Sequence, residues 1–153
     1  MNGMIEPNGT SRIYLDTNIF IYAIQGDEQI FGPLQGLFDL LRMKKGIAVT
    51  SELTLAEVLP GARDVDRRNY LNLIVWSGIF DLRAVSRDIL METADYRKAA
   101  GMPKLPDAIH AVTAIRAGCH KILSSDRRLR LPAGYSVISP EPANLDALIR
   151  ELA

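Results

Sequence analysis

The sequence predicts an α/β fold in which helices cover both faces of a central parallel sheet. Short apolar runs typical of strands alternate with helical patterns from about residue 12 to the end. Parallel strands need long crossover connections, and helices commonly provide them. The chain has 153 residues, of which 48% are hydrophobic, so it can build one domain around a substantial core.

Five short runs are predicted to be strands because they are apolar and rich in β-branched or aromatic residues. The first, RIYL, ends at an aspartate, and the third, FDLRAV, alternates between apolar and polar residues. In chain order the runs are Arg12–Leu15, Ile47–Thr50, Phe80–Val85, Lys121–Ser124 and Tyr135–Ile138. In such a sheet, functional side chains gather beyond the carboxyl ends of the strands.

Seven segments are predicted to be helices. The first is apolar on all sides and should be buried, and most of the others carry apolar residues at helical spacing. Ser86 is a suitable N-cap for the fifth helix, and Gly118 suits the end of the sixth. In chain order the segments are Asn18–Ile24, Leu34–Lys44, Ser51–Leu59, Val65–Trp76, Arg87–Ala100, Pro106–Ala117 and Ala143–Leu152.

Composition excludes several classes of protein. Lysine plus arginine and aspartate plus glutamate both number 18, so bulk positive charge does not drive nucleic-acid binding. The single cysteine, Cys119, forms no intrachain disulfide, and no apolar run reaches the roughly 20 residues that span a bilayer. We expect a flexible leader over residues 1–11, one domain over residues 12–153, and a cytoplasmic location.

Four carboxylates stand against apolar surroundings. Asp16 follows the first strand, Glu57 lies within TLAEVL, Asp107 opens the sixth helix, and Asp126 follows the fourth strand. Buried carboxylates that repel one another are costly, and a hard divalent cation such as Mg²⁺ or Mn²⁺ removes that cost. The four residues are therefore candidates for an acidic, metal-binding site.

Each carboxylate also has a structural interpretation. Asp16 can cap the first helix, and Thr54 with Glu57 has the spacing of a capping box. Asp107 is favoured by the helix dipole alone, and Asp126 can be an ordinary turn residue. A metal-binding site is excluded only if all four of these structural interpretations are correct at once.

Other kinds of functional site have less support in the sequence than the acidic metal-binding site. The two common glycine-rich phosphate cradles and any cysteine-rich zinc site are missing from the sequence. His110 lies one helical turn after Asp107 and can face the same pocket, although a packed or hydrogen-bonded core histidine is the favoured interpretation. His120 is expected on the surface, and Cys119 is expected to be a small buried apolar group.

Basic residues cluster near two of the carboxylates. Arg127, Arg128 and Arg130 directly follow Asp126, and Lys104 precedes Asp107. We expect Lys104, Arg127 and Arg128 to bind the phosphates of a polyanionic strand beside the acidic pocket. A second pair, Arg67 and Arg68, is expected to be solvated surface.

The ordered motifs YLDTNIFIY, SELTLAEVL, LPDAIHAVTAI and ILSSDRRL resemble those of PIN-domain ribonucleases, particularly VapC-like toxins of type II toxin–antitoxin pairs. The resemblance extends from about Arg12 to Ile138 and implies a three-layer α/β/α sandwich. It implies that Asp16, Glu57, Asp107 and Asp126 form the acidic cluster, with Asn18 and Ser124 in support. Where the family usually carries Thr-x-Asp, this chain has Ser124-Ser125-Asp126, which keeps the hydroxyl.

The resemblance also implies a chemistry. Asp16, Asp107 and Asp126 would bind Mg²⁺ or Mn²⁺, and Glu57 would orient or deprotonate the attacking water or complete the metal shell. The implied reaction is hydrolysis of RNA phosphodiester bonds to leave a 5′-phosphate. The implied partners are RNA, a small antitoxin protein that blocks the site, and a second copy of the chain in a homodimer.

Four alternatives remain at this point. The chain can be an RNA-processing PIN nuclease without a toxin role, or a PIN scaffold that only binds. A haloacid-dehalogenase-type phosphatase would use Asp16 as nucleophile. That family has an Asp-x-Asp motif, and this chain has Asn18 in place of the second aspartate. A receiver-type signalling module needs an acidic pair at the first strand, where this sequence offers one aspartate.

Overall fold

Five parallel strands form one sheet in the computed structural model, which describes residues 11–26 and 28–153. The predicted leader, residues 1–11, lies outside the described residues except for Ser11. The strands are β1 (Ile13–Leu15), β2 (Ala48–Ser51), β3 (Phe80–Arg83), β4 (Lys121–Leu123) and β5 (Ser136–Ile138). Their order across the sheet is β3-β2-β1-β4-β5, and every neighbouring pair is parallel. The predicted α/β fold with a parallel sheet is confirmed.

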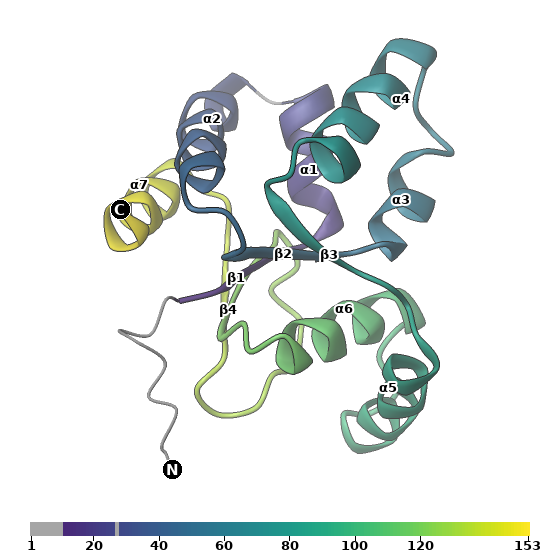
Figure 1. Ribbon diagram of the computed structural model, residues 1–153. Coiled ribbons are helices and arrows are strands. Elements are labelled where there is room, and N and C mark those ends of the chain that lie inside the picture. Colours follow the sequence, from purple (N-terminus) through teal and green to yellow (C-terminus); the bar gives the residue numbers. More distant parts are fainter. Residues whose placement is uncertain (1–10, 27) are drawn as a thin grey trace.

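Helices cover both faces of this sheet, which gives three layers (Figure 1). One layer lies above the sheet in Figure 1, and the other lies below it. The first layer contains α1 (Thr17–Gln25), α2 (Glu28–Met43), α3 (Leu53–Val58), α4 (Asp64–Leu71), η1 (Asn72–Trp76) and α7 (Pro142–Leu152). The second layer contains α5 (Arg87–Ala99) and α6 (Leu105–Arg116).

Alternate residues of the central strand supply the two cores. Ile13 and Leu15 belong to the larger core beneath α1, α2 and α7, and Tyr14 between them packs in the smaller core against α6. This alternation follows from the two-residue period of a strand. β1 is buried on both faces, so Asp16 at its carboxyl end enters the centre of the molecule.

The second helix begins six residues earlier than its sequence pattern predicts. Gly32 and Pro33 have low helix propensity, and Pro33 lacks a backbone N–H, yet both lie inside α2. The apolar stripe of α2, including Leu37 and Leu41, is fully buried in the larger core. Tertiary packing therefore outweighs the local cost of the two helix-breaking residues.

The predicted helix over Val65–Trp76 changes character in its second half. Its last five residues form the π-helical turn η1, in which the wider turn rotates the side chains relative to an α-helix. Leu73 and Ile74 are buried as a result, whereas Val75 faces solvent.

The predicted caps and buried groups of the second layer agree with the structure. The Ser86 hydroxyl accepts a hydrogen bond from the backbone N–H of Ile89 at the start of α5. Gly118, just after α6, has a positive φ of 75°, a conformation that favours glycine. Cys119 is fully buried, and burial raises the pKa of its thiol to about 12.

Within the described residues, none of the helices combines the length and apolar character needed to span a bilayer.

Candidate active site at the carboxyl edge of the sheet

Asp16 occupies the centre of the candidate site. It follows β1 directly, and its backbone N–H donates to the carbonyl of Leu123 at the end of the neighbouring strand β4. Its Oδ1 accepts a hydrogen bond from the backbone N–H of Thr17 at 2.8 Å, so Asp16 is the N-cap of α1. The residue is only 8% exposed. The capping interpretation is therefore correct as a description of geometry, and it leaves Oδ2 for other contacts.

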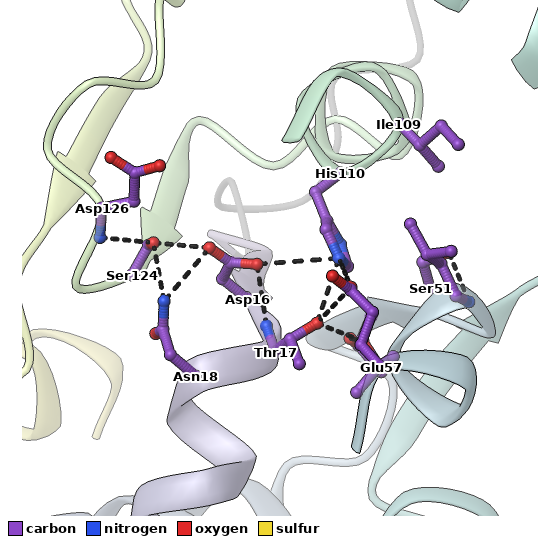
Figure 2. Close-up of polar contacts among 12 residues, drawn as sticks. Asp16, Thr17, Asn18, Ser51, Glu57, Ile109, His110, Ser124 and Asp126 are labelled. Atoms are coloured by element: carbon purple, nitrogen blue, oxygen red, sulfur yellow. Dashed lines mark hydrogen bonds and ion pairs between the residues drawn. The ribbon is translucent and has the colours of Figure 1, made fainter. Parts of the chain in front are cut away.

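Two polar side chains hold the second oxygen of Asp16 (Figure 2). The buried Ser124 hydroxyl donates to Oδ2 at 2.6 Å. The side-chain amide of Asn18 lies 3.5 Å from both Oδ2 and the Ser124 hydroxyl, and its carbonyl accepts from the backbone N–H of Ser125. Asn18 and Ser124 thus join the start of α1 to the end of β4 around the carboxylate.

Glu57 reaches the site from α3, on the other side of Asp16. Its Oε1 accepts hydrogen bonds from the Thr17 hydroxyl at 2.7 Å and from His110 Nε2 at 2.6 Å. Burial raises the pKa of Glu57, but the hydrogen bonds from His110 and Thr17 outweigh it and lower the pKa overall. The N-cap of α3 is Glu52, so Thr54 and Glu57 do not form the capping box that their spacing permits.

His110 is a buried polar residue that contacts both the core and the candidate site. It is 2% exposed, and its Nδ1 lies 2.6 Å from the hydroxyl of the fully buried Tyr14. Its Nε2 faces Glu57 Oε1, the Thr17 hydroxyl at 3.1 Å and, farther off, Asp16 Oδ1 at 3.7 Å. The prediction of a hydrogen-bonded core histidine is confirmed, and the same residue also faces the candidate site.

Asp107 stands in the first turn of α6 and is partly exposed. Burial raises the pKa of its carboxyl group, and the negative charges of Asp126, Asp16 and Glu57 raise it further, against a smaller opposing effect of His110. The four carboxylates therefore interact electrostatically at this edge of the sheet.

Asp126 takes a different orientation. Its backbone N–H donates to the Ser124 hydroxyl, but its carboxyl group turns away from Asp16 (Figure 2). Oδ1 accepts hydrogen bonds from the backbone and the guanidinium group of Arg128. Burial raises the pKa of Asp126, and the interactions with Arg128 and the charge of Lys104 lower it overall.

A pocket of about 440 Å³ adjoins the acidic edge. Asp107 and Asp126 line it together with Lys104, Arg128 and Arg130, so the structure brings these predicted residues together. Arg127 lies elsewhere: it pairs with Glu141 at 2.6 Å and lines a larger hollow of about 650 Å³ along β5. None of the four predicted carboxylates lines that larger hollow, so the smaller pocket is the one next to the candidate chemistry.

The donor set suits a hard divalent cation with several bound waters. In the described part of the chain, no three acidic, histidine or cysteine side chains are already arranged as a complete metal-binding group. Mg²⁺ usually keeps several waters and takes only one or two carboxylates from the protein. Asp16 and Asp107 offer such oxygens, and a bound cation would offset both the burial of Asp107 and the repulsion from its acidic neighbours, the two causes that raise its pKa.

Some residues of the site were not predicted from the sequence. Thr17 and Tyr14 contribute hydroxyl groups that contact Glu57 and His110. The motif LDTN places Thr17 between two predicted site residues, which is a usable signal. Tyr14 gives no such signal, because a tyrosine in a buried strand is typical of an ordinary core.

Two solved structures share this fold. A chain in the structure of FitAB bound to an IR36 DNA fragment superimposes with a TM-score of 0.64 at 17% identity, covering 84% of this chain and 94% of that chain. A chain of VapBC2 from Rickettsia felis, bound to a DNA fragment from its promoter, gives a TM-score of 0.59 at 17% identity. That match covers 83% of this chain and 98% of the other. No curated protein matches the sequence.

The sequence itself identifies the family. A family model described as "PIN domain" matches residues 13–135, which include all four predicted carboxylates. The matched segment runs from β1 to the residue before β5 and so contains four of the five strands. This chain therefore belongs to the PIN domain family.

Proposed function

We propose that this PIN domain is a metal-dependent endoribonuclease that hydrolyses RNA phosphodiester bonds with Mg²⁺ or Mn²⁺ as cofactor. The observation that carries the proposal is the concentration of Asp16, Glu57 and Asp107 at one edge of the sheet. These residues come from three separate segments. Burial raises the pKa of Asp107, and the negative charges of Asp126, Asp16 and Glu57 raise it further. A site with this charge attracts a cation, which in turn attracts a phosphate.

Asp16 and Asp107 are the proposed principal metal ligands. Asp126 is proposed as a weaker or second ligand, because Arg128 already occupies its Oδ1. When bound, the cation lowers the pKa of a water molecule and neutralises negative charge on the scissile phosphate. Ser124 and Asn18 keep Asp16 in place, so the carboxylate does not have to reorganise during the reaction.

Glu57 is proposed to orient the attacking water. Its Oε1 is engaged by Thr17 and His110, which leaves Oε2 as the oxygen that can accept a hydrogen bond from that water. The lowered pKa keeps Glu57 ionised at neutral pH, which suits a hydrogen-bond acceptor. Water attacks the phosphorus and the 3′ oxygen of the upstream nucleotide leaves, which yields a 3′-hydroxyl and a 5′-phosphate.

RNA is proposed to enter along the pocket that adjoins the acidic edge. Lys104 and Arg128 line this pocket beside Asp107, where they can bind the phosphates that flank the scissile bond. Arg127 is proposed as a more distant RNA contact, since it pairs with Glu141 on the β5 side. The local positive charge compensates for the zero net charge of the whole chain.

We further propose that the chain is the toxin of a toxin–antitoxin pair and acts in the cytoplasm as a homodimer. The PIN family assignment and the likeness of its fold to chains of FitAB and VapBC2 complexes support this proposal. A small antitoxin protein would cover the acidic edge, where a basic side chain can pair with Asp16 or Asp107.

The nuclease proposal is tested with the purified full-length protein and a mixed single-stranded RNA. Cleavage is expected with Mn²⁺ and not with excess EDTA, and Mn²⁺ alone should raise the melting temperature. Asp107→Asn should abolish cleavage, whereas the matched control Asp95→Asn, at an exposed position of α5, should not. Cleavage that persists in EDTA would overturn the metal mechanism, and hydrolysis of a small phosphate ester instead of RNA would favour a phosphatase.

The toxin proposal needs a separate test. Induced expression in a bacterial host should arrest growth, and the Asp107→Asn protein should not. Normal growth despite wild-type RNA cleavage in vitro would contradict the toxin role and leave an RNA-processing nuclease.

A further inference from the structure

A chain of short hydrogen bonds runs from the core of the protein to the candidate site. Figure 2 shows its outer end, where His110 contacts Glu57. It begins at the hydroxyl of Tyr14 in the central strand, passes through both ring nitrogens of His110 in α6, and ends at Glu57 in α3. The two links measure 2.6 Å each. Tyr14 and His110 are buried, so water does not compete for these bonds.

The partners of His110 assign its proton. Nε2 faces Glu57 Oε1, and an ionised carboxylate only accepts hydrogen bonds, so Nε2 must carry a hydrogen. The Thr17 hydroxyl donates to the same Oε1 and is left to accept from Nε2. A hydrogen on Nε2 excludes the tautomer protonated at Nδ1 alone, and Nδ1 shares its own hydrogen bond with the Tyr14 hydroxyl.

Glu57 depends on these hydrogen bonds because the short helix that carries it does little to fix the orientation of its side chain. α3 has six residues and no side-chain cap, and Glu57 is the fifth of them. Its side chain is 31% exposed, whereas that of His110 is 3% exposed. Without partners, a glutamate side chain at such a place samples several rotamers. The hydrogen bonds to Thr17 and His110 are what select one of them.

We propose that His110 is a positioning residue: braced by the Tyr14 hydroxyl, its Nε2–H holds Glu57 in one orientation beside Asp16. This inference rests on the proposed function, in which Glu57 orients the attacking water. It assigns a role to the two buried groups, Tyr14 and His110, neither of which is itself a proposed metal ligand. The expected effect of losing such an outer support is about 10–100-fold in activity or metal affinity.

The first test reads the tautomer itself. A long-range ¹H–¹⁵N spectrum of the full-length protein should show a hydrogen on Nε2 of His110, and Tyr14→Phe should shift its Nδ1 resonance. The other histidine, His120, is exposed and stacks on Tyr135, so it serves as an internal reference. An Nδ1–H tautomer in the wild-type protein would overturn the proposed hydrogen-bond chain.

The second test compares three variants in RNA cleavage with Mn²⁺. His110→Leu should lower kcat about 10–100-fold and change the KM for RNA less than about twofold. His110→Gln should recover part of that loss, because a glutamine amide can place a donor near the Nε2 position. The matched control His120→Gln should behave like the wild-type protein.

Mn²⁺ binding without RNA gives a readout that is independent of cleavage. Calorimetry with MnCl₂ should show that His110→Leu binds Mn²⁺ more weakly than wild type does. The affinity of His110→Gln should lie between the two. If wild-type protein binds Mn²⁺ but cleaves no RNA, the proposed function fails while the binding comparison still tests His110. Equal kcat and equal Mn²⁺ affinity in His110→Leu and wild type would overturn the inference. Equal losses in the Leu and Gln variants would assign His110 to folding alone.

Discussion

The hydroxyl group of Ser124 donates a 2.6 Å hydrogen bond to Oδ2 of Asp16, across 108 positions of the sequence. It links the end of the central strand β1 to the end of its neighbour β4. The same hydroxyl accepts a hydrogen bond from the backbone N–H of Asp126. Ser124 therefore couples the orientation of one carboxylate to the position of the loop that carries another.

Replacement of Ser124 should separate the effect of its hydroxyl from that of its size. Ser124→Thr keeps the hydroxyl and should retain cleavage within a fewfold. Ser124→Ala leaves Oδ2 of Asp16 and the N–H of Asp126 without this partner, and we expect about a tenfold loss of kcat. RNA cleavage assays of both variants check this, and an alanine variant as active as the threonine variant would contradict it.

Asp16 should be dispensable for folding and essential for cleavage. An asparagine caps helices about as well as an aspartate and removes a charge from a crowded site, so Asp16→Asn should be as stable as wild type without metal, or more so. Asp16→Ala loses the cap and should be less stable by about 1 kcal/mol. Thermal melts in EDTA and RNA cleavage in Mn²⁺ measure the two effects.

The matched control for the cap is Ser86→Ala at the start of α5. It should also lose about 1 kcal/mol of stability but keep full activity, because Ser86 lies outside the candidate site. An active Asp16→Asn enzyme would show that Asp16 is a cap and nothing more.

Two carboxylates of the site should affect stability with opposite signs as the pH changes. The raised pKa of Asp107 means that folding becomes less favourable as the pH rises above the ordinary carboxyl range. Asp107→Asn removes this penalty, so the variant should exceed wild type in metal-free stability at pH 7, and the difference should vanish below about pH 4.

Glu57 should behave in the reverse way. Its lowered pKa stabilises the folded state above the ordinary carboxyl range, and this stabilisation is lost as the pH falls through the lowered value. Glu57→Gln should therefore be less stable than wild type at pH 7 and equal to it in acid. Urea unfolding in EDTA from pH 3 to pH 7 measures both differences, and curves of the same sign would contradict the assignment.

The basic residues near the pocket should differ in their contribution to RNA binding. Arg128 has an 84% exposed side chain and lines the pocket with Lys104, whereas Arg127 is paired with Glu141. Replacing Lys104 and Arg128 together with alanine should reduce the slope of log K against log salt by about 1–2. Arg127→Ala should reduce it less, and equal slopes for the double variant and wild type would assign these residues to solvated surface.

The strands and the site carboxylates could be predicted from the sequence because each depends on short segments. An apolar run such as IYL followed by an aspartate indicates a buried strand end whatever the remaining chain does. The start of α2 could not be predicted, since its helical state at Pro33 depends on packing of the later stripe. The π-helical turn η1 was missed because its pattern of apolar residues also fits an α-helix.

The hydrogen-bond partners within the site were less predictable than the carboxylates. Tyr14, Thr17 and His110 contact one another or Glu57, although 96 positions separate Tyr14 from His110. Buried tyrosine and threonine residues are common in apolar strands and helices, so their types do not reveal a polar cluster. These side chains come together because α6 packs against Tyr14 of β1 and α1 packs against α3.

The buried Cys119 makes the protein convenient to label. Burial raises the pKa of this thiol to about 12, so it carries its proton at neutral pH, and it has no exposed surface. Maleimides and disulfide reagents should therefore spare the native protein. Because Cys119 is the only cysteine, a second one introduced at the exposed Met43 would be the single reactive site for a fluorophore or spin label.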